Sequence, residues 1–140
     1  MAPINFLATF FAAVLSMITG SLWYGPLFGK QWSALGGATK ERMEQAKAKG
    51  MVKSYGLMFI GSLLMSYVLA NALVFAATYL KTSGAGSGVM VGFFNWAGFI
   101  APVTLGVVLW EGKSWKLWLI NNGYYLVTLI LMGILLALWT

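Results

Sequence analysis

The chain has 140 residues, of which 60% are hydrophobic and 9% are charged, against roughly 45–50% and about 25% in ordinary soluble domains. A soluble domain of this size still exposes about a third of the surface of its unfolded chain, so this composition excludes an ordinary soluble fold and predicts a single all-α membrane domain over residues 1–140. The net charge is +6, but the basic residues lie beside apolar runs, which favours anionic lipid headgroups over nucleic acid as their partner.

Four apolar segments are long enough to cross a bilayer, which takes about 20 residues at a rise of about 1.5 Å each. The predicted spans run from about Ile4 to Tyr24, Tyr55 to Tyr79, Val89 to Trp110 and Trp118 to Trp139. No Lys or Arg precedes the first segment, and its apolar run exceeds the roughly 7–15 residues of a signal peptide. We therefore expect four transmembrane helices, the first of them uncleaved.

Small residues recur along the first span at every fourth position, which lets a neighbouring helix approach closely. These helix-packing positions are Ala8, Ala12, Ser16 and Gly20, and similar rows are Ser62, Ser66 and Ala70 in the second span and Gly84, Gly88 and Gly92 at the start of the third. Spacing does not say whether such faces meet within one chain or between chains. Because four helices have few internal faces, we predict a homo-oligomer.

The long segment over residues 25–54 follows a break predicted at Gly25-Pro26. A short amphipathic helix is expected from about Lys40 to Lys49, capped by Thr39 and stopped by Gly50. It would lie on the membrane surface with its basic residues toward the headgroups, or it would dock an unknown membrane-protein partner.

The basic residues give the chain a predicted orientation. Eight lie in the first and third connecting segments, namely Lys30, Lys40, Arg42, Lys47, Lys49, Lys53, Lys113 and Lys116, and the second segment carries Lys81 alone. By the positive-inside rule the first and third segments are cytoplasmic. Both termini and the loop Lys81–Ser87 are then expected on the periplasmic or extracellular side.

Polar residues within the spans fall into two predicted layers. The outer layer is Asn71 and Asn95, and the cytoplasmic cluster is Glu111, Asn121, Asn122, Lys113 and Lys116. The asparagines would form hydrogen bonds between helices or line a solute pathway. Glu111 would be a solvated or paired carboxylate at the membrane boundary, or a gate or proton site.

Pro102 predicts a kink in the third span, because it lacks a backbone N–H and its ring crowds the carbonyl of Gly98. The freed carbonyls could coordinate an ion, although neighbouring groups accommodate most prolines in membrane helices without such a role.

Several stretches of the chain resemble a known family. They are LWYGPLFGKQW after the first span and GFIAP, EGKSWKLWLINNGYYLV and MGILLALW through the last two spans. In that order they resemble the family called domain of unknown function 1761, over nearly the whole chain. The resemblance implies a small integral protein of the prokaryotic inner membrane and carries no catalytic residues over.

Two similar segments within the chain indicate an internal repeat. LWYG followed by KQW after the first span matches LWEG followed by KSW after the third. Since two spans preserve orientation, this would be a parallel repeat of two helical hairpins.

Two classes of function remain. The first is a non-enzymatic, oligomeric assembly or partner-binding protein. The alternative is a small channel or transporter for an ion or small neutral solute. An enzyme, a metal site and a cofactor are not predicted, because the chain has no Cys, His or Asp, and its acids are Glu41, Glu44 and Glu111.

Overall fold

The computed structural model describes residues 4–35, 51–81 and 84–139, and these residues form helices and no strand. The elements are α1 (Phe6–Leu22), the π-helix η1 (Trp23–Leu27), α2 (Gly29–Ala34), α4 (Met51–Tyr79), α5 (Gly84–Asn95), the π-helix η2 (Trp96–Ile100), α6 (Ala101–Leu109) and α7 (Trp115–Leu138). Four continuous helices are long and apolar enough to cross a membrane: Phe6–Leu27, Val52–Tyr79, Gly84–Leu109 and Trp115–Leu138. The prediction of an all-α protein with four helices long and apolar enough to span a membrane is confirmed for the described residues.

The third helix begins at Gly84, earlier than the expected Val89, so Gly84–Gly88 is helical and does not belong to the outer loop. Glycine is a poor helix former, but Gly88 lies so close to α7 that a Cβ on it would overlap the backbone of Gly133. Helix packing therefore outweighs propensity here. The early start also places Asn95 about 17 Å along the helix, near the middle of the span.

Gly25-Pro26 does not end the first helix, contrary to the sequence prediction. The chain widens into η1, where the amide of Phe28 donates to the carbonyl of Trp23 at 2.8 Å. This bond reaches five residues back, and such a π turn is one of the local adjustments that accommodate proline in membrane helices.

A π turn also precedes Pro102. In η2 the amide of Ala101 bonds to the carbonyl of Trp96, again five residues back, and Pro102 then falls in the first turn of α6. The irregularity predicted at this proline is therefore a π turn on its N-terminal side.

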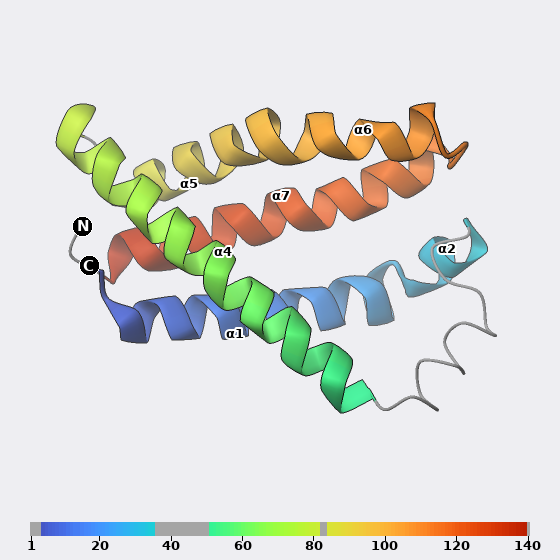
Figure 1. Ribbon diagram of the computed structural model, residues 1–140, viewed down its shortest axis with the longest axis horizontal. Helices are drawn as coiled ribbons and strands as arrows, with labels where there is room; N and C mark the ends of the chain where they lie inside the picture. Colours follow the sequence, from blue (N-terminus) through green and yellow to red (C-terminus); the bar gives the residue numbers. More distant parts are fainter. Residues whose placement is uncertain (1–3, 36–50, 82–83, 140) are drawn as a thin grey trace.

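The helices form a layer of three with the fourth laid across it (Figure 1). α1, α7 and the continuous α5–η2–α6 helix run side by side, and α4 crosses them obliquely. The start of α1 and the end of α7 lie at one end of the bundle, where the side-chain amide of Asn5 donates to the carbonyl of Trp139 at 3.1 Å. We call this the terminal end and the other the opposite end.

The small-residue rows meet within one chain. Ala8, Ala12 and Ser16 are buried on α1, as are Ser62, Ser66 and Ala70 on α4. Ser16 Oγ lies 3.3 Å from Ser62 Oγ, and Ser66 Oγ donates to the carbonyl of Thr9 at 2.9 Å. Gly20 faces the ring of Tyr124. A Cβ added at Gly20 would lie 3.0 Å from the hydroxyl oxygen of Tyr124. The two serine contacts join α1 to α4 where the helices cross, and the Gly20 contact joins α1 to α7.

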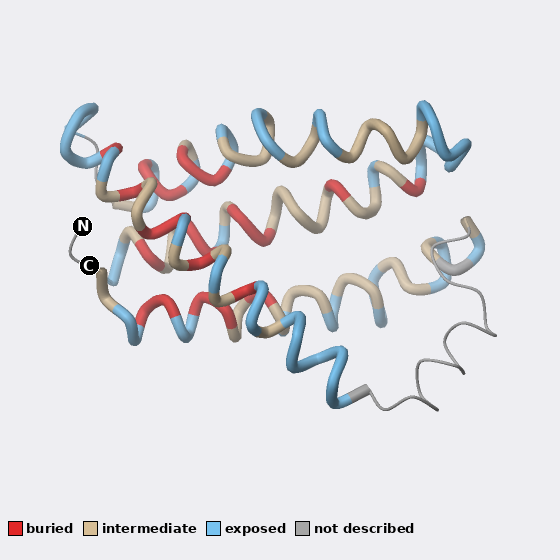
Figure 2. Tube along the Cα trace, viewed as in Figure 1, coloured by how far each residue is buried: buried red, intermediate tan, exposed pale blue. Residues whose placement is uncertain are grey.

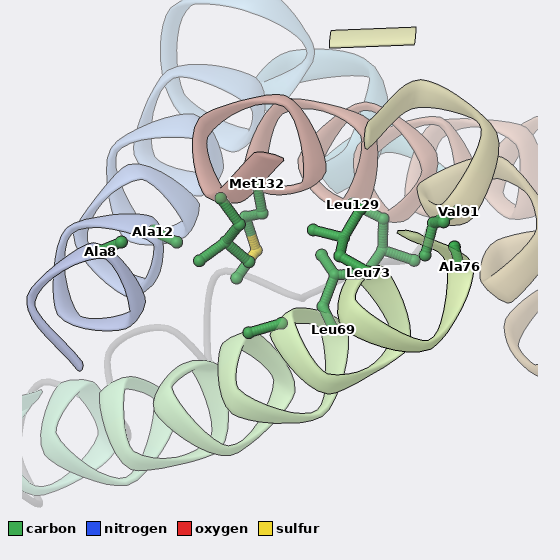
Figure 3. Packing of buried hydrophobic residues seen from close by; sticks show 10 residues of the cluster. Ala8, Ala12, Leu69, Leu73, Ala76, Val91, Leu129 and Met132 are labelled. Carbon is green, nitrogen blue, oxygen red and sulfur yellow. The ribbon is translucent and has the colours of Figure 1, made fainter. Parts of the chain in front are cut away.

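Figure 3 shows the apolar core at this crossing. Met132 of α7 lies between the alanines of α1 and the leucines of α4, and Val91 closes the side toward α5. Burial is concentrated toward the terminal end, whereas α4 from Val52 to Met58 is exposed (Figure 2). Exposed apolar residues on α4 are compatible with lipid as solvent.

Two predictions are not addressed by these contacts. The amphipathic helix from Lys40 to Lys49 with its cap Thr39 lies outside the described residues. The internal repeat also stays a prediction, because η1 lies at the end of its span and η2 near the middle of its own, so the two π-helices are not equivalent.

Candidate functional site

Two of the stretches on which the family resemblance rests contact each other at the opposite end. The indole Nε1 of Trp23 in η1 donates to the carbonyl of Ile120 in α7 at 2.9 Å. The same ring covers Gly123, where a Cβ would lie 3.0 Å from the ring atom Cζ2. A larger residue at this place would require the indole to shift by a few tenths of an ångström.

Tyr24 makes the second contact between these stretches. Its hydroxyl donates to Asn121 Oδ1 at 2.7 Å. Its ring lies 5.1 Å from the ring of Trp32 and 5.2 Å from that of Tyr124, both at steep interplanar angles typical of edge-on aromatic pairs. Sequence reasoning missed Trp23 and Tyr24 as partners of α7, because neither spacing nor hydropathy pairs residues that lie so far apart along the chain.

Asn122 faces a different neighbour. It is buried, its Nδ2 donates to the carbonyl of Trp118 at 3.1 Å, and its Oδ1 lies 3.0 Å from Thr104 Oγ1 of α6. The Thr104 hydroxyl is also 2.8 Å from the carbonyl of Ile100, so its single hydrogen serves one acceptor at a time. The two neighbouring asparagines thus connect α7 to two different helices, one each.

The remaining members of the predicted cytoplasmic cluster are not gathered around these amides. Glu111, Lys113 and Lys116 are exposed at the turn between α6 and α7. Among the residues that the structure describes, the Glu111 carboxylate has no ion pair. The described contacts therefore join Asn121 and Asn122 to Tyr24 and Thr104 and leave the three charged side chains facing outward.

The outer layer consists of two asparagines that bond to their own helices. Asn71 Nδ2 donates to the carbonyl of Tyr67 at 2.9 Å, and Asn95 Nδ2 donates to that of Val91 at 2.8 Å. Each amide keeps a second N–H and a carbonyl oxygen beyond this bond. The two differ in setting, because Asn95 lines a groove and Asn71 does not.

This groove runs between α4, η2 and α7 and has a volume of about 370 Å³. Its walls carry apolar side chains and the single amide of Asn95; they are Gly61, Leu64, Met65, Val68, Leu69, Asn95, Phe99, Ile100 and Leu129. Much of this wall is exposed, including Leu64 and Phe99. The groove therefore opens at the side of the bundle, near the middle of the candidate span Gly84–Leu109.

A smaller chamber of about 170 Å³ adjoins the groove, and the two share Gly61, Met65, Ile100 and Leu129 as wall residues. The chamber reaches inward to α1, and the residues with polar side chains that line it are Ser16, Ser62, Tyr124, Tyr125 and Thr128, although the surface facing the chamber is mostly apolar. Thr128 is buried, and its Oγ1 has no hydrogen-bond partner among the described residues. A buried hydroxyl in this state costs about 1–3 kcal/mol.

The chemistry available to the groove and chamber is hydrogen bonding and apolar contact. Their walls contain amide, hydroxyl and aromatic groups and no charged side chain. Among the residues described, no group of three or more potential metal-ligating acids gathers anywhere. The arrangement is suited to holding an apolar helix or an amphiphilic molecule.

Comparison with known proteins gives one family match. A family model with the description "Protein of unknown function (DUF1761)" matches residues 7–137. No curated protein and no solved structure matches the chain. The match covers nearly all of the four candidate spans and both contacting stretches.

Proposed function

The chain belongs to the family of proteins of unknown function DUF1761, and from its site we propose that it is a non-enzymatic, oligomeric assembly or partner-binding protein of the prokaryotic inner membrane. The observation that carries the proposal is the position of Asn95. Its amide lies on the wall of a groove that opens toward lipid near mid-membrane. Lipid offers it no hydrogen bond, so an incoming helix with a polar group gains by binding there.

The intrahelical bond to Val91 uses one N–H of the Asn95 amide. A second copy of the chain, presenting its own Asn95, could satisfy the rest in a reciprocal pair around a twofold axis. Hydrogen bonds of this kind between membrane helices contribute about 0.6–2 kcal/mol. The surrounding Leu64, Val68 and Phe99 would add close apolar contact.

The test compares Asn95→Leu with Asn71→Leu. Both substitutions remove an amide that is bonded to its own helix, but only Asn95 lines the groove. We expect Asn95→Leu to weaken self-association about 3- to 30-fold, the equivalent of 0.6–2 kcal/mol, and Asn71→Leu to leave it unchanged. Single-molecule photobleaching in lipid vesicles at several protein densities gives the association constants. Monomers at every density for the unmodified chain would reject self-association.

A small channel or transporter for an ion or neutral solute is the second candidate. It is favoured by the π-helix η2 beside the chamber, because interrupted helices next to cavities recur in transport proteins. The core cluster of Met132, Leu136 and Leu73 fills the bundle toward the terminal end, which weakens this candidate for a single chain. The rates of glycerol and cation flux should be compared between vesicles with the purified protein reconstituted in their membrane and vesicles without protein. Equal rates would reject this candidate.

We further propose that both termini are periplasmic or extracellular. Lys30 lies in α2, and Lys113 and Lys116 lie around the start of α7, all at the opposite end (Figure 1). Lys81 follows α4 at the terminal end. By the positive-inside rule the opposite end is cytoplasmic. A reporter fused at Thr140 should therefore behave as periplasmic and one inserted near Ala46 as cytoplasmic, and the reverse labelling would overturn the orientation.

A further inference from the structure

The continuous α5–η2–α6 helix packs against α7 unequally along its length. Four residues of α5 are buried, and at Gly88 and Gly92 its backbone lies directly against that of α7. No residue of α6 is buried, and the structure describes all of α6. The two halves therefore differ in what holds them to α7, which is backbone packing for α5 and looser side-chain contact for α6.

The boundary between these halves is η2, where the helix has several features that make bending easier. The amide of Ala101 bonds five residues back to the carbonyl of Trp96, and Pro102 has no amide hydrogen to donate. Gly98 lies in the same π-helix, and a Cβ added there would meet nothing within 4 Å, so no side-chain contact stiffens this turn. Sharp bends in helices occur at such π turns and prolines.

Among the residues described, one side-chain hydrogen bond joins α6 to α7. Thr104 Oγ1 lies 3.0 Å from Asn122 Oδ1 and 2.8 Å from the carbonyl oxygen of Ile100 in its own continuous helix. If α6 moves away from α7, the hydroxyl keeps an acceptor by turning its hydrogen toward Ile100. The oxygen of Asn122 then loses this donor, and the residue is 2% exposed. Because a buried oxygen without a donor is unfavourable, this hydrogen bond holds α6 against α7.

We propose that η2 is a hinge and that the hydrogen bond between Thr104 and Asn122 is a latch, so that α6 swings away from α7 while α5 stays packed. Ile100 of η2 lines both the groove and the chamber, so a bend at η2 changes the width of both. Hinges of this kind are short segments that absorb the backbone change between two rigid parts. The motion takes place within one chain and does not depend on self-association through Asn95.

The first test measures distances between helices in the full chain, with a single copy in each nanodisc. The chain has no cysteine, so a pair of introduced cysteines carries the only spin labels. Leu109→Cys with Leu119→Cys reports on α6 and α7, and Val89→Cys with Leu131→Cys reports on α5 and α7 as the matched control. All four side chains are exposed, so the labels do not enter the core. Pulsed electron paramagnetic resonance gives the distribution of each distance.

We expect two distances for the α6–α7 pair, a shorter one with the latch closed and a longer one with α6 swung out. The α5–α7 pair should give one narrow distance. A single narrow distance for both pairs would overturn the hinge. Two distances for both pairs would also overturn it, because α5 would then move as well. Since each nanodisc holds one copy, the outcome is independent of whether the chain self-associates.

The second test removes the latch. Thr104→Val keeps the shape of the side chain and removes the hydroxyl, so the ratio of the longer to the shorter α6–α7 distance should rise about 3- to 30-fold, the equivalent of about 0.6–2 kcal/mol. Thr104→Ser retains a hydroxyl and should restore the original ratio. The matched control is Thr19→Val, because Thr19 Oγ1 also donates to its own helix, at 2.8 Å from the carbonyl oxygen of Leu15. An unchanged ratio in Thr104→Val, or an equal rise in Thr19→Val, would overturn the latch.

The third test locates the bend. Gly98→Ala favours regular helix in η2, and its added Cβ meets no neighbour, so the longer α6–α7 distance should become rarer. Gly106→Ala makes the same change within α6, where the Cβ would meet only an ordinary contact with Trp110 at 3.5 Å, and it should leave the ratio unchanged. Equal behaviour of the two alanine variants would show that the bend does not lie at η2 and would overturn the hinge.

Discussion

At the terminal end of the bundle, α5 and α7 meet at glycines, whereas at the opposite end aromatic rings and amides join η1 to α7. A Cβ on Gly92 would lie 2.7 Å from the carbonyl oxygen of Leu129, and one on Gly88 would overlap Gly133. At the other end the indole of Trp23 reaches the carbonyl of Ile120 through a single side chain. One end therefore relies on backbone contact and the other on side chains that bridge a wider gap.

This difference shows where the helices leave space between them for another molecule. Close glycine contacts leave no space for a ligand and fix the angle at which helices cross. Where α4 departs from the layer, the groove and chamber form between it, η2 and α7. Rigid packing at one end thus supports an open surface farther along the same helices.

The largest effect is expected where backbones touch. Gly88→Ala adds one methyl group that overlaps the backbone of Gly133, which cannot move aside as a flexible side chain can. We expect a loss of about 3 kcal/mol, at the upper end of the usual cost of overpacking. The measurement is the thermal melting of the purified protein in one detergent.

Gly86→Ala is the control for this change. It lies on the same helix, but its added Cβ meets nothing within 4 Å, so the variant should gain up to about 1 kcal/mol from the better helix propensity of alanine. If both variants melt together, the glycine contact does not hold α5 against α7.

The next effect concerns α1. Ser16 is 2% exposed and lies 3.3 Å from Ser62 of α4, so Ser16→Leu would push the two helices apart at a cost of about 2 kcal/mol. Leu15→Ala on the neighbouring, less buried face should cost less. Melting curves of the two variants rank them, and the reverse order would mean that the crossing of α1 and α4 tolerates bulk.

A substitution at the opposite end should lower stability less, because single side chains join the helices there. Tyr24→Phe keeps the ring contacts and removes the hydrogen bond to Asn121 Oδ1, with an expected loss of about 1 kcal/mol. In the background of Asn121→Leu the same change should cost much less, since the acceptor is gone. A full cost in both backgrounds would show that the hydroxyl acts on something other than Asn121.

Much of this fold could be predicted from the sequence, and particular residues show why. Lipid imposes long apolar helices on any spanning segment, so hydropathy alone finds all four. Rows such as Ala8, Ala12 and Ser16 predict close packing, because small residues have little other use at regular spacing in a membrane helix. The third helix was predicted to begin at Val89, but it begins at Gly84. The contact between Gly88 and Gly133 is tertiary, so local sequence does not reveal it.

The candidate site was less accessible to such reasoning. Asn95 was recognised as polar, but the groove beside it exists because of the angle of α4, which periodicity does not encode. The break predicted at Gly25-Pro26 is a π turn, in which a backbone hydrogen bond reaches five residues back and accommodates the proline, and sequence periodicity does not reveal such a turn. The unpartnered hydroxyl of Thr128 was missed because finding it requires coordinates.

The smallest effect is expected at Glu111, which tests whether charge contributes to the opposite end. Its carboxylate is exposed and has no ion pair among the described residues. Glu111→Gln and Glu111→Ala should therefore each change stability by less than about 0.5 kcal/mol, as exposed substitutions usually do. Melting curves of both variants and the unmodified chain in one detergent decide the point. A loss of about 1–3 kcal/mol, with alanine worse than glutamine, would instead show a charged hydrogen bond, which a second copy of the chain or a residue outside the described ranges would have to provide.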